Sequence, residues 1–296
     1  LILETKEDDP LQRKKGSKTR LAVLSTHLPF SVTVGHVKFA SIILIMKVLR
    51  ELKKVYEFSD FFICGDFNLV PCSMLYDFLV SSSLDLNLGL KDFSMQKWAL
   101  DLQKEKEVRE FLKDFDRKRI PSSEKKQSEV SEDFYRILLN VRPIIDEGEL
   151  IRFSPPEETS SSDLSLVSEA FRELSKSMGF RSSYAEVKNS VIRSQNPGSS
   201  SPESDHSPTH NEISYSHFTK KMTLPIDFVF FHSQGALEPI SVLDVPDLEW
   251  MIEQGKGCPF GPFGSDHVSL VVDFELKDRQ IDEALLPIDE IKLYPR

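Results

Sequence analysis

Six polar side chains lie beside apolar runs that are long enough to form buried strands. They are His27, Asp66, Asn68, Asp227, Asp266 and His267. Side chains at strand ends project into loops, where they are free to do chemistry. An imidazole can move a proton near neutral pH, and a carboxylate can bind a divalent cation or orient a neighbouring imidazole. These residue types therefore indicate proton transfer assisted by a metal ion.

The six residues belong to four motifs, which are Ser-Thr-His-Leu at 25–28, Gly-Asp-Phe-Asn at 65–68, Pro-Ile-Asp-Phe at 225–228 and Ser-Asp-His at 265–267. Each motif alone has a structural explanation as a capped loop or a turn. Asp227 is harder to explain in this way, because it lies between Ile226 and Phe228 and an unpaired carboxylate is costly to bury. The order of the four motifs in one chain is more specific than any single motif.

The elements that must position these motifs alternate between strand and helix. Residues 21–24 and 61–64 read as short buried strands. Between them, apolar residues recur at helical spacing over 36–55, and a second helix follows the second strand. Strand character returns in 226–231 and 268–274. The pattern predicts a layered α/β domain.

The composition divides the chain into a domain and a long insertion. We expect 1–95 and 222–276 to form the two parts of one domain, because both are compact and apolar. Residues 96–221 read as a charged, helical and low-complexity insertion. Within it, 190–213 is rich in Ser and Pro and is expected to lack fixed structure. Residues 277–296 form a C-terminal tail.

Charge and cysteine content exclude several classes of protein. The formal net charge of −10 argues against electrostatic wrapping of nucleic acid, although a bound cation would supply positive charge locally. The odd count of three cysteines, without a Cys-x-x-Cys pair, argues against structural zinc and disulfides. The chain is therefore expected in the cytoplasm, with the nucleus as the alternative, and away from membranes. His206 and His210, with His217 beyond them, read as part of the Ser/Pro-rich stretch rather than as a metal site.

The ordered motifs resemble the endonuclease/exonuclease/phosphatase superfamily. Pro71, Leu75 and Tyr76, which follow Gly-Asp-Phe-Asn, are similar to the Angel and nocturnin branch, which is related to the deadenylases. The likeness covers about 20–95 and 222–276. It implies a deoxyribonuclease-I-like sandwich of four layers, with two sheets flanked by helices. The chain is expected to hold only the C-terminal half of that fold.

The resemblance implies a catalytic role for five residues. His27 would contact the substrate phosphate, and Asn68, which is expected with His27 to bind substrate, would hold Asp66 in place. Asp66 would orient the attacking water or steady the developing charge. His267 would touch a phosphoryl oxygen or manage a proton, and Asp227 would orient its imidazole. The residue chemistry agrees, because a carboxylate behind a histidine fixes its tautomer.

The resemblance also implies a site for Mg²⁺ or Mn²⁺, with Asp66 and Asp266 as ligands. Relatives place their principal metal ligand, a glutamate, in the N-terminal half of the fold. Glu4 and Glu7 lie in a polar stretch that is expected to form no strand, and they match nothing in the family pattern. We therefore expect the chain alone to be nearly inactive and poorly soluble.

Two functions from different classes stay open at this point. The first is a Mg²⁺-dependent phosphodiesterase or phosphatase that acts on RNA, either a poly(A) 3′-exoribonuclease or an RNA-end phosphatase. The motifs indicate phosphate-ester chemistry but do not select the leaving group. The second is a non-catalytic scaffold, or a truncated product, that binds a protein partner of the mRNA machinery through the insertion 96–221.

Overall fold

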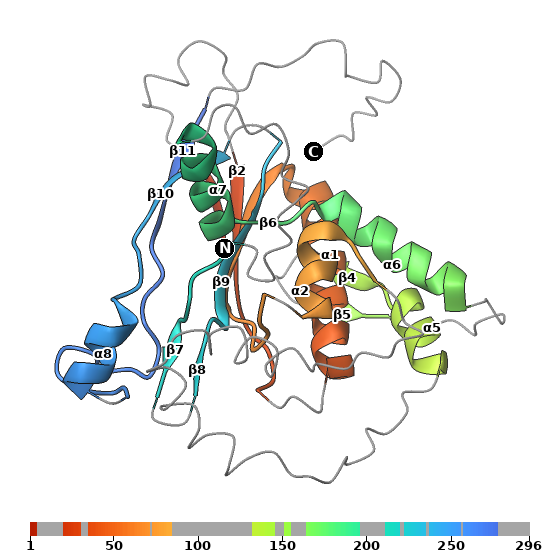
Figure 1. Cartoon of the computed structure of the whole chain (residues 1–296). Coiled ribbons are helices and arrows are strands. Elements are labelled where there is room, and N and C mark those ends of the chain that lie inside the picture. The colour runs from red at the N-terminus through yellow and green to blue at the C-terminus, as the bar shows by residue number, and fades with distance from the viewer. Residues whose placement is uncertain are drawn as a thin grey trace, which may run out of the picture.

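A mixed five-stranded sheet lies at the centre of the computed structural model (Figure 1). Its strands run in the order β1 (Ile2–Glu4), β2 (Arg20–His27), β3 (Asp60–Asp66), β9 (Asp227–His232) and β6 (Arg181–Ser182). β2 and β3 are parallel, and the other pairs are antiparallel. The structure describes residues 1–4, 20–30, 35–71, 73–84, 132–145, 151–154, 164–195, 211–219, 222–234, 237–255 and 257–277.

Four helices pack on one side of this sheet (Figure 1). They are α1 (Gly35–Tyr56), α2 (Met74–Ser81), α5 (Glu132–Asn140) and α6 (Leu164–Met178). The amphipathic helix expected at 36–55 is confirmed as α1, and its apolar stripe is at most 1 % exposed at Phe39, Ile42, Ile43, Met46 and Leu49. Burial of this stripe against the sheet stabilises the arrangement, because apolar area leaves water.

Part of the expected insertion belongs to the same core. Val167 and Phe171 of α6 are fully buried, and the Phe171 ring contacts Phe39 of α1 at 5.2 Å between centroids. β6 pairs with β9 and so adds an edge strand to the central sheet. Residues 164–195 are therefore structural members of the domain, although their charged composition suggested an insertion.

The boundaries predicted for the segment without fixed structure are too wide. Helix α7 (Ser183–Gln195) continues past residue 190, and Ile213 is 1 % exposed. Residues 196–210 lie outside the described residues. The last residues of α7 are as polar as the Ser/Pro-rich stretch that follows them. Composition alone therefore could not show where the helix ends.

A two-stranded antiparallel pair lies on the other side of the sheet, formed by β10 (Leu237–Val242) and β11 (Val272–Leu276) (Figure 1). Phe274 of β11 contacts two rings of the central sheet, Phe62 at 4.4 Å and Phe231 at 5.4 Å. The remaining elements are two short pairs and one helix, which are β4 (Pro143–Ile145) with β5 (Ile151–Phe153), β7 (His217–Phe218) with β8 (Thr223–Leu224), and α8 (Leu248–Gly255). The described residues therefore form an α/β fold of mixed sheets and helices.

The N-terminal residues form a strand, contrary to expectation. β1 pairs with β2 and places Ile2 opposite Ala22 and Glu4 opposite Arg20. The polar composition of the following residues hid this strand, which is only three residues long. Within the described ranges, none of the helices has the length and apolar content needed to cross a membrane.

Candidate functional site

Strand register brings three of the six residues to one edge of the sheet. His27 is opposite Asp66 in the parallel pair β2–β3, and Asp66 is opposite Asp227 in the antiparallel pair β3–β9. His27 Nε2 lies 3.4 Å from Asp66 Oδ2. The His27 side chain is 74 % exposed, whereas that of Asp66 is 16 % exposed. The imidazole therefore faces solvent, and the carboxylate lies behind it.

The loop after β3 is held by several hydrogen bonds. The Asn68 backbone amide donates to Asp66 Oδ1 at 2.8 Å, and Asn68 Nδ2 donates to the Leu28 carbonyl at 2.9 Å. Lys38 of α1 is fully buried, and its ammonium donates to the Asn68 carbonyl at 2.6 Å. Asn68 has φ +48°, a conformation that Asn tolerates better than most residues. These contacts fix the position of the Asp66 carboxylate.

Gly65 allows the close approach of β2 and β3 at the site. Its φ is +140°, and a Cβ placed there would lie 1.9 Å from the Thr26 carbonyl oxygen. No side chain fits that space, and the positive φ also favours glycine. Gly65 therefore lets β3 stay paired with β2 as far as Asp66.

His267 is oriented by Asp227. The distance from His267 Nδ1 to Asp227 Oδ2 is 2.7 Å, and this hydrogen bond is the main cause that raises the pKa of His267. With Nδ1 bound to the carboxylate, Nε2 is the nitrogen left for a ligand. Burial raises the pKa of Asp66, and Asp227 adds to this rise, while the Asn68 backbone hydrogen bond opposes it.

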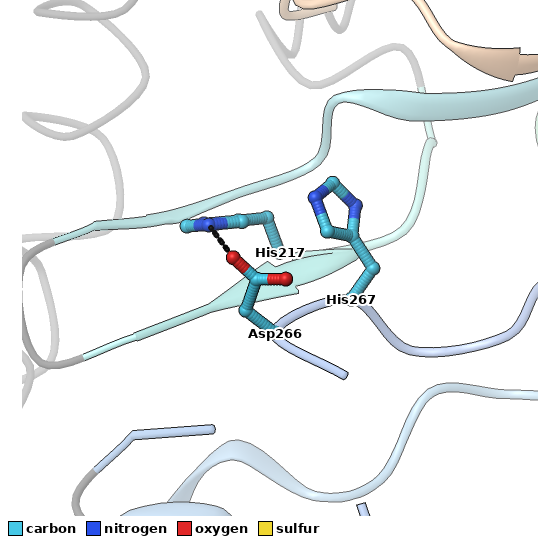
Figure 2. Close-up of side chains that lie close together, drawn as sticks. All are labelled: His217, Asp266 and His267. Carbon is cyan, nitrogen blue, oxygen red and sulfur yellow. Dashed lines mark ion pairs between the residues drawn. The ribbon is translucent and has the colours of Figure 1, made fainter. Parts of the chain in front are cut away.

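His217 is a further residue of the site, which sequence reasoning missed. Its Nε2 lies 3.5 Å from Asp266 Oδ2, and its ring is 4.9 Å from the His267 ring in an edge-on arrangement (Figure 2). An isolated bridge pairs His217 with His267, and the Phe218 amide donates to the Asp266 carbonyl at 2.9 Å. The short strand β7 therefore holds His217 against the Ser-Asp-His motif.

The electrostatic setting of His217 differs from that of His267. Burial lowers the pKa of His217, and His267 lowers it further, while Asp266 and the Met222 backbone oppose this. By distance and angle, His217 Nδ1 is buried and has no hydrogen-bond partner among the described residues. The His217 side chain is only 9 % exposed.

Two clusters of side chains in the described part of the chain could hold a metal ion. Asp66, Asp227 and His267 form one, and His217, Asp266 and His267 form the other, with the ligand atoms of each cluster within 4.8 Å of one another. The sequence predicted Asp66 and Asp266 as joint ligands. In the structure Asp66 and Asp266 lie in different clusters that share His267, and their role as metal ligands stays a prediction.

All six residues expected at the site are therefore placed around Asp66 and His267, and their chemical roles stay predictions. Glu4 can be rejected as a metal ligand, because its partner Arg20 lies about 23 Å from His27 at 3.3 Å per residue along β2. Glu7 lies outside the described residues, as do His206 and His210. Nothing in the sequence around His217 distinguished it from these neighbours.

Sequence relatives of the chain come from one group of proteins. No protein-family model matches it. Carbon catabolite repressor protein 4 homolog 3 of Arabidopsis thaliana is 25 % identical over 265 residues, which are 89 % of this chain and 48 % of that protein. Protein angel homolog 1 of Rattus norvegicus is 35 % identical over 95 residues, which are 28 % of this chain and 14 % of that protein. The chain spans about half the length of homolog 3.

Solved structures of ANGEL2, described as a 2′,3′-cyclic phosphatase, share the fold. One matches with a TM-score of 0.50 and 17 % identity, over 86 % of this chain and 57 % of the ANGEL2 chain. Another, in complex with adenosine-2′,3′-vanadate, matches with a TM-score of 0.50 and 16 % identity, over 93 % of this chain and 66 % of that chain. The likeness extends beyond 20–95 and 222–276, so the expectation of a C-terminal half alone is not supported.

The chain shares an α/β fold with ANGEL2, and its sequence resembles proteins of the endonuclease/exonuclease/phosphatase superfamily. Within that superfamily, the resemblance is to the branch of the carbon catabolite repressor 4 and Angel proteins, which is related to the deadenylases.

Proposed function

We propose that this site hydrolyses a phosphate ester at the end of an RNA chain with the help of a divalent cation. The observation that carries the proposal is the Asp227–His267 hydrogen bond beside the buried Asp66 carboxylate. Two carboxylates and an oriented imidazole within 4.8 Å supply a proton acceptor, a proton donor and oxygen ligands at one point.

The residues present fit Mg²⁺ or Mn²⁺. Mg²⁺ sites commonly use one or two carboxylates, and Asp66 and Asp227 supply two oxygen donors next to each other. When bound, the ion supplies positive charge to a phosphoryl oxygen. The expectation of near inactivity assumed that Asp66 and Asp266 hold the ion alone. Asp227 is a second carboxylate beside Asp66 that could hold the ion. We therefore propose that the chain itself has measurable activity.

The chain's own groups divide the proton chemistry between them. The Asp66 carboxylate accepts a proton from the attacking water. The His267 imidazolium donates a hydrogen bond from Nε2 to a phosphoryl oxygen, while Asp227 holds Nδ1. The water oxygen forms the new bond to phosphorus as the bond to one ester oxygen breaks. The leaving oxygen takes up a proton from solvent, and Asp66 returns its proton to solvent. Exposed His27 contacts the phosphate from the solvent side.

The substrate class is supported by the solved relatives. ANGEL2 is described as a 2′,3′-cyclic phosphatase, and one of its solved structures holds adenosine-2′,3′-vanadate. We therefore propose an RNA 2′,3′-cyclic phosphate as the substrate of this chain, with removal of 3′ adenylates as the alternative.

The sandwich of four layers, the cytoplasmic location and a protein partner bound through 96–221 also stay proposals. The Phe274 contacts support the first of these, because they pack β11 on the sheet face opposite the helices.

A substrate panel tests this function. Purified chain is incubated with Mg²⁺ and three RNA oligonucleotides, which end in a 2′,3′-cyclic phosphate, a 3′-phosphate or a poly(A) tract. The proposal predicts that the cyclic end opens while the oligonucleotide keeps its length. Shortening of the poly(A) RNA alone would favour the exoribonuclease. A folded chain that leaves all three unchanged would overturn the proposal.

A further inference from the structure

His217 has no part in the proposed hydrolysis, although it is nine-tenths buried beside the site. Its Nε2 points toward the Asp266 carboxylate at 3.5 Å, as Figure 2 shows. Its Nδ1 is buried and has no hydrogen-bond partner among the described residues. The desolvation of this imidazole is therefore compensated only in part, and a cation bound by the ring would offset some of that cost.

The neighbouring His267 is prepared to act as a metal ligand through Nε2. Histidine ligands usually donate their other ring N–H to a carboxylate, which fixes the tautomer and raises the basicity of the ligating nitrogen. Asp227 makes this contact with His267 Nδ1 at 2.7 Å. His217, Asp266 and His267 then offer two imidazole nitrogens and one carboxylate oxygen, all within 4.8 Å.

This donor set differs from the carboxylate pair of the proposed catalytic cation. Imidazole suits zinc, copper, iron and nickel, whereas magnesium prefers oxygen. Two histidines and one carboxylate, with an open fourth position, are a known zinc arrangement. Asp266 is 52 % exposed on its side chain, so an ion can enter from solvent.

We propose that His217, Asp266 and His267 form a second cation site, which binds a divalent transition metal of the zinc class and thereby inhibits the hydrolysis. The inhibition rests on the proposed function, whereas the metal binding does not. His267 Nε2 can carry either a proton or a metal ion. A metal bound at His267 Nε2 occupies the position from which this nitrogen would contact the phosphoryl oxygen, so the metal and the substrate exclude each other there.

The binding half is tested with Co²⁺, whose visible absorption reports coordination by nitrogen and oxygen. The full chain should bind one Co²⁺ that Zn²⁺ displaces and that excess Mg²⁺ does not. His217→Asn and Asp266→Asn should each weaken Co²⁺ binding at least about 10-fold, since each removes a ligand. The half-exposed Asp266 keeps the test valid if the His217 variant fails to fold. His36→Asn, a histidine of α1 outside the cluster, is the control and should bind as the wild type does.

The proposed inhibition is tested by measuring the rate of RNA hydrolysis of each protein with Zn²⁺ and dividing it by the rate of the same protein without Zn²⁺. The Zn²⁺ concentration that halves Mg²⁺-dependent RNA hydrolysis should rise at least about 10-fold in His217→Asn and stay unchanged in His36→Asn. Undiminished Co²⁺ binding by a folded His217→Asn would overturn the site. Full Co²⁺ occupancy without inhibition would overturn the competition at His267. If no protein hydrolyses RNA, the proposed function fails, and the Co²⁺ titration still decides whether the site exists.

Discussion

Asp66 and Asp227 lie directly opposite each other in the antiparallel pair of β3 and β9. Like charges at opposed positions of a sheet repel, and Asp66 is also shielded from water. Burial and Asp227 together raise the pKa of Asp66 above its ordinary value of 3.8. The site therefore costs the fold stability at neutral pH, which is common where residues are arranged for catalysis.

Asp66→Asn should raise Tm at pH 7, because it removes a buried charge next to Asp227. The folded pKa is the higher one, so the cost is absent below the unfolded pKa and grows as pH rises through the folded pKa. The gain in Tm, about 2–4 °C for each kcal/mol, should therefore disappear below about pH 4. Calorimetry at pH 7 and pH 3.5 measures the difference. A lower Tm at pH 7 would show that the carboxylate stabilises the fold instead.

Asp227→Asn should lower the rate of hydrolysis about 10²–10⁴-fold, because His267 loses its orienting carboxylate. The hydrogen bond raises the pKa of His267, so the variant should lose the imidazolium at a lower pH than the wild type. In the pH–rate profile, the alkaline limb should move toward lower pH. An alkaline limb that stays in place would exclude His267 as its source.

Gly65→Ala should disrupt the junction of β2 and β3. A Cβ at this position meets the Thr26 carbonyl oxygen at 1.9 Å, and the φ of +140° is strained for alanine. Destabilisation of about 3 kcal/mol or more is expected, with loss of hydrolysis. Gly264→Ala, next to the Ser-Asp-His motif, is the matched control, because its Cβ meets nothing within 4 Å. Equal Tm values for the two variants would contradict the close approach of the strands.

Lys47→Met should separate α5 from α1. The buried Lys47 ammonium donates to the carbonyls of Leu138, Leu139 and Val141 at 2.7–2.8 Å, at the C-terminal end of α5. Burial lowers its pKa to about 8, so it stays largely protonated at pH 7. Without the ammonium, the three carbonyls lose a hydrogen-bond donor, and the free energy of unfolding should fall by about 1–3 kcal/mol.

Lys54→Met is the control for that experiment. Lys54 lies on the same helix, is exposed and forms an ion pair with Glu51 at 2.9 Å, and such surface pairs contribute little. Urea unfolding at pH 7 should show a lower midpoint for Lys47→Met than for Lys54→Met. Equal midpoints would mean that α5 is not held by Lys47.

The sequence was informative where structure is local. Helical spacing of apolar residues located α1, and the apolar run at 61–64 located β3 ahead of Asp66. Each predicted strand lies next to a short polar motif, so the sequence could predict that these motifs meet at one edge of the sheet. Each motif is only a few adjacent residues long, and it can therefore be recognised without knowledge of distant contacts.

The parts that were missed depend on contacts between distant residues. His217 reaches the site through a bridge to His267, fifty positions later, and its own strand has only two residues. β6 is equally short and joins the sheet only because β9 offers it an edge. No periodicity develops over two residues, so neither element leaves a pattern in the sequence.

The most direct test of the proposed site is hydrolysis of an RNA that ends in a 2′,3′-cyclic phosphate, with protein in excess over RNA and Mg²⁺ present. The wild-type chain should open the cyclic ester, and a chelator should stop the reaction. Folded Asp66→Asn should be slower by about 10²-fold or more, since it lacks the proton acceptor. Hydrolysis by Asp66→Asn at the wild-type rate, or none by the folded wild-type chain, would contradict the assignment of this sheet edge as the active site.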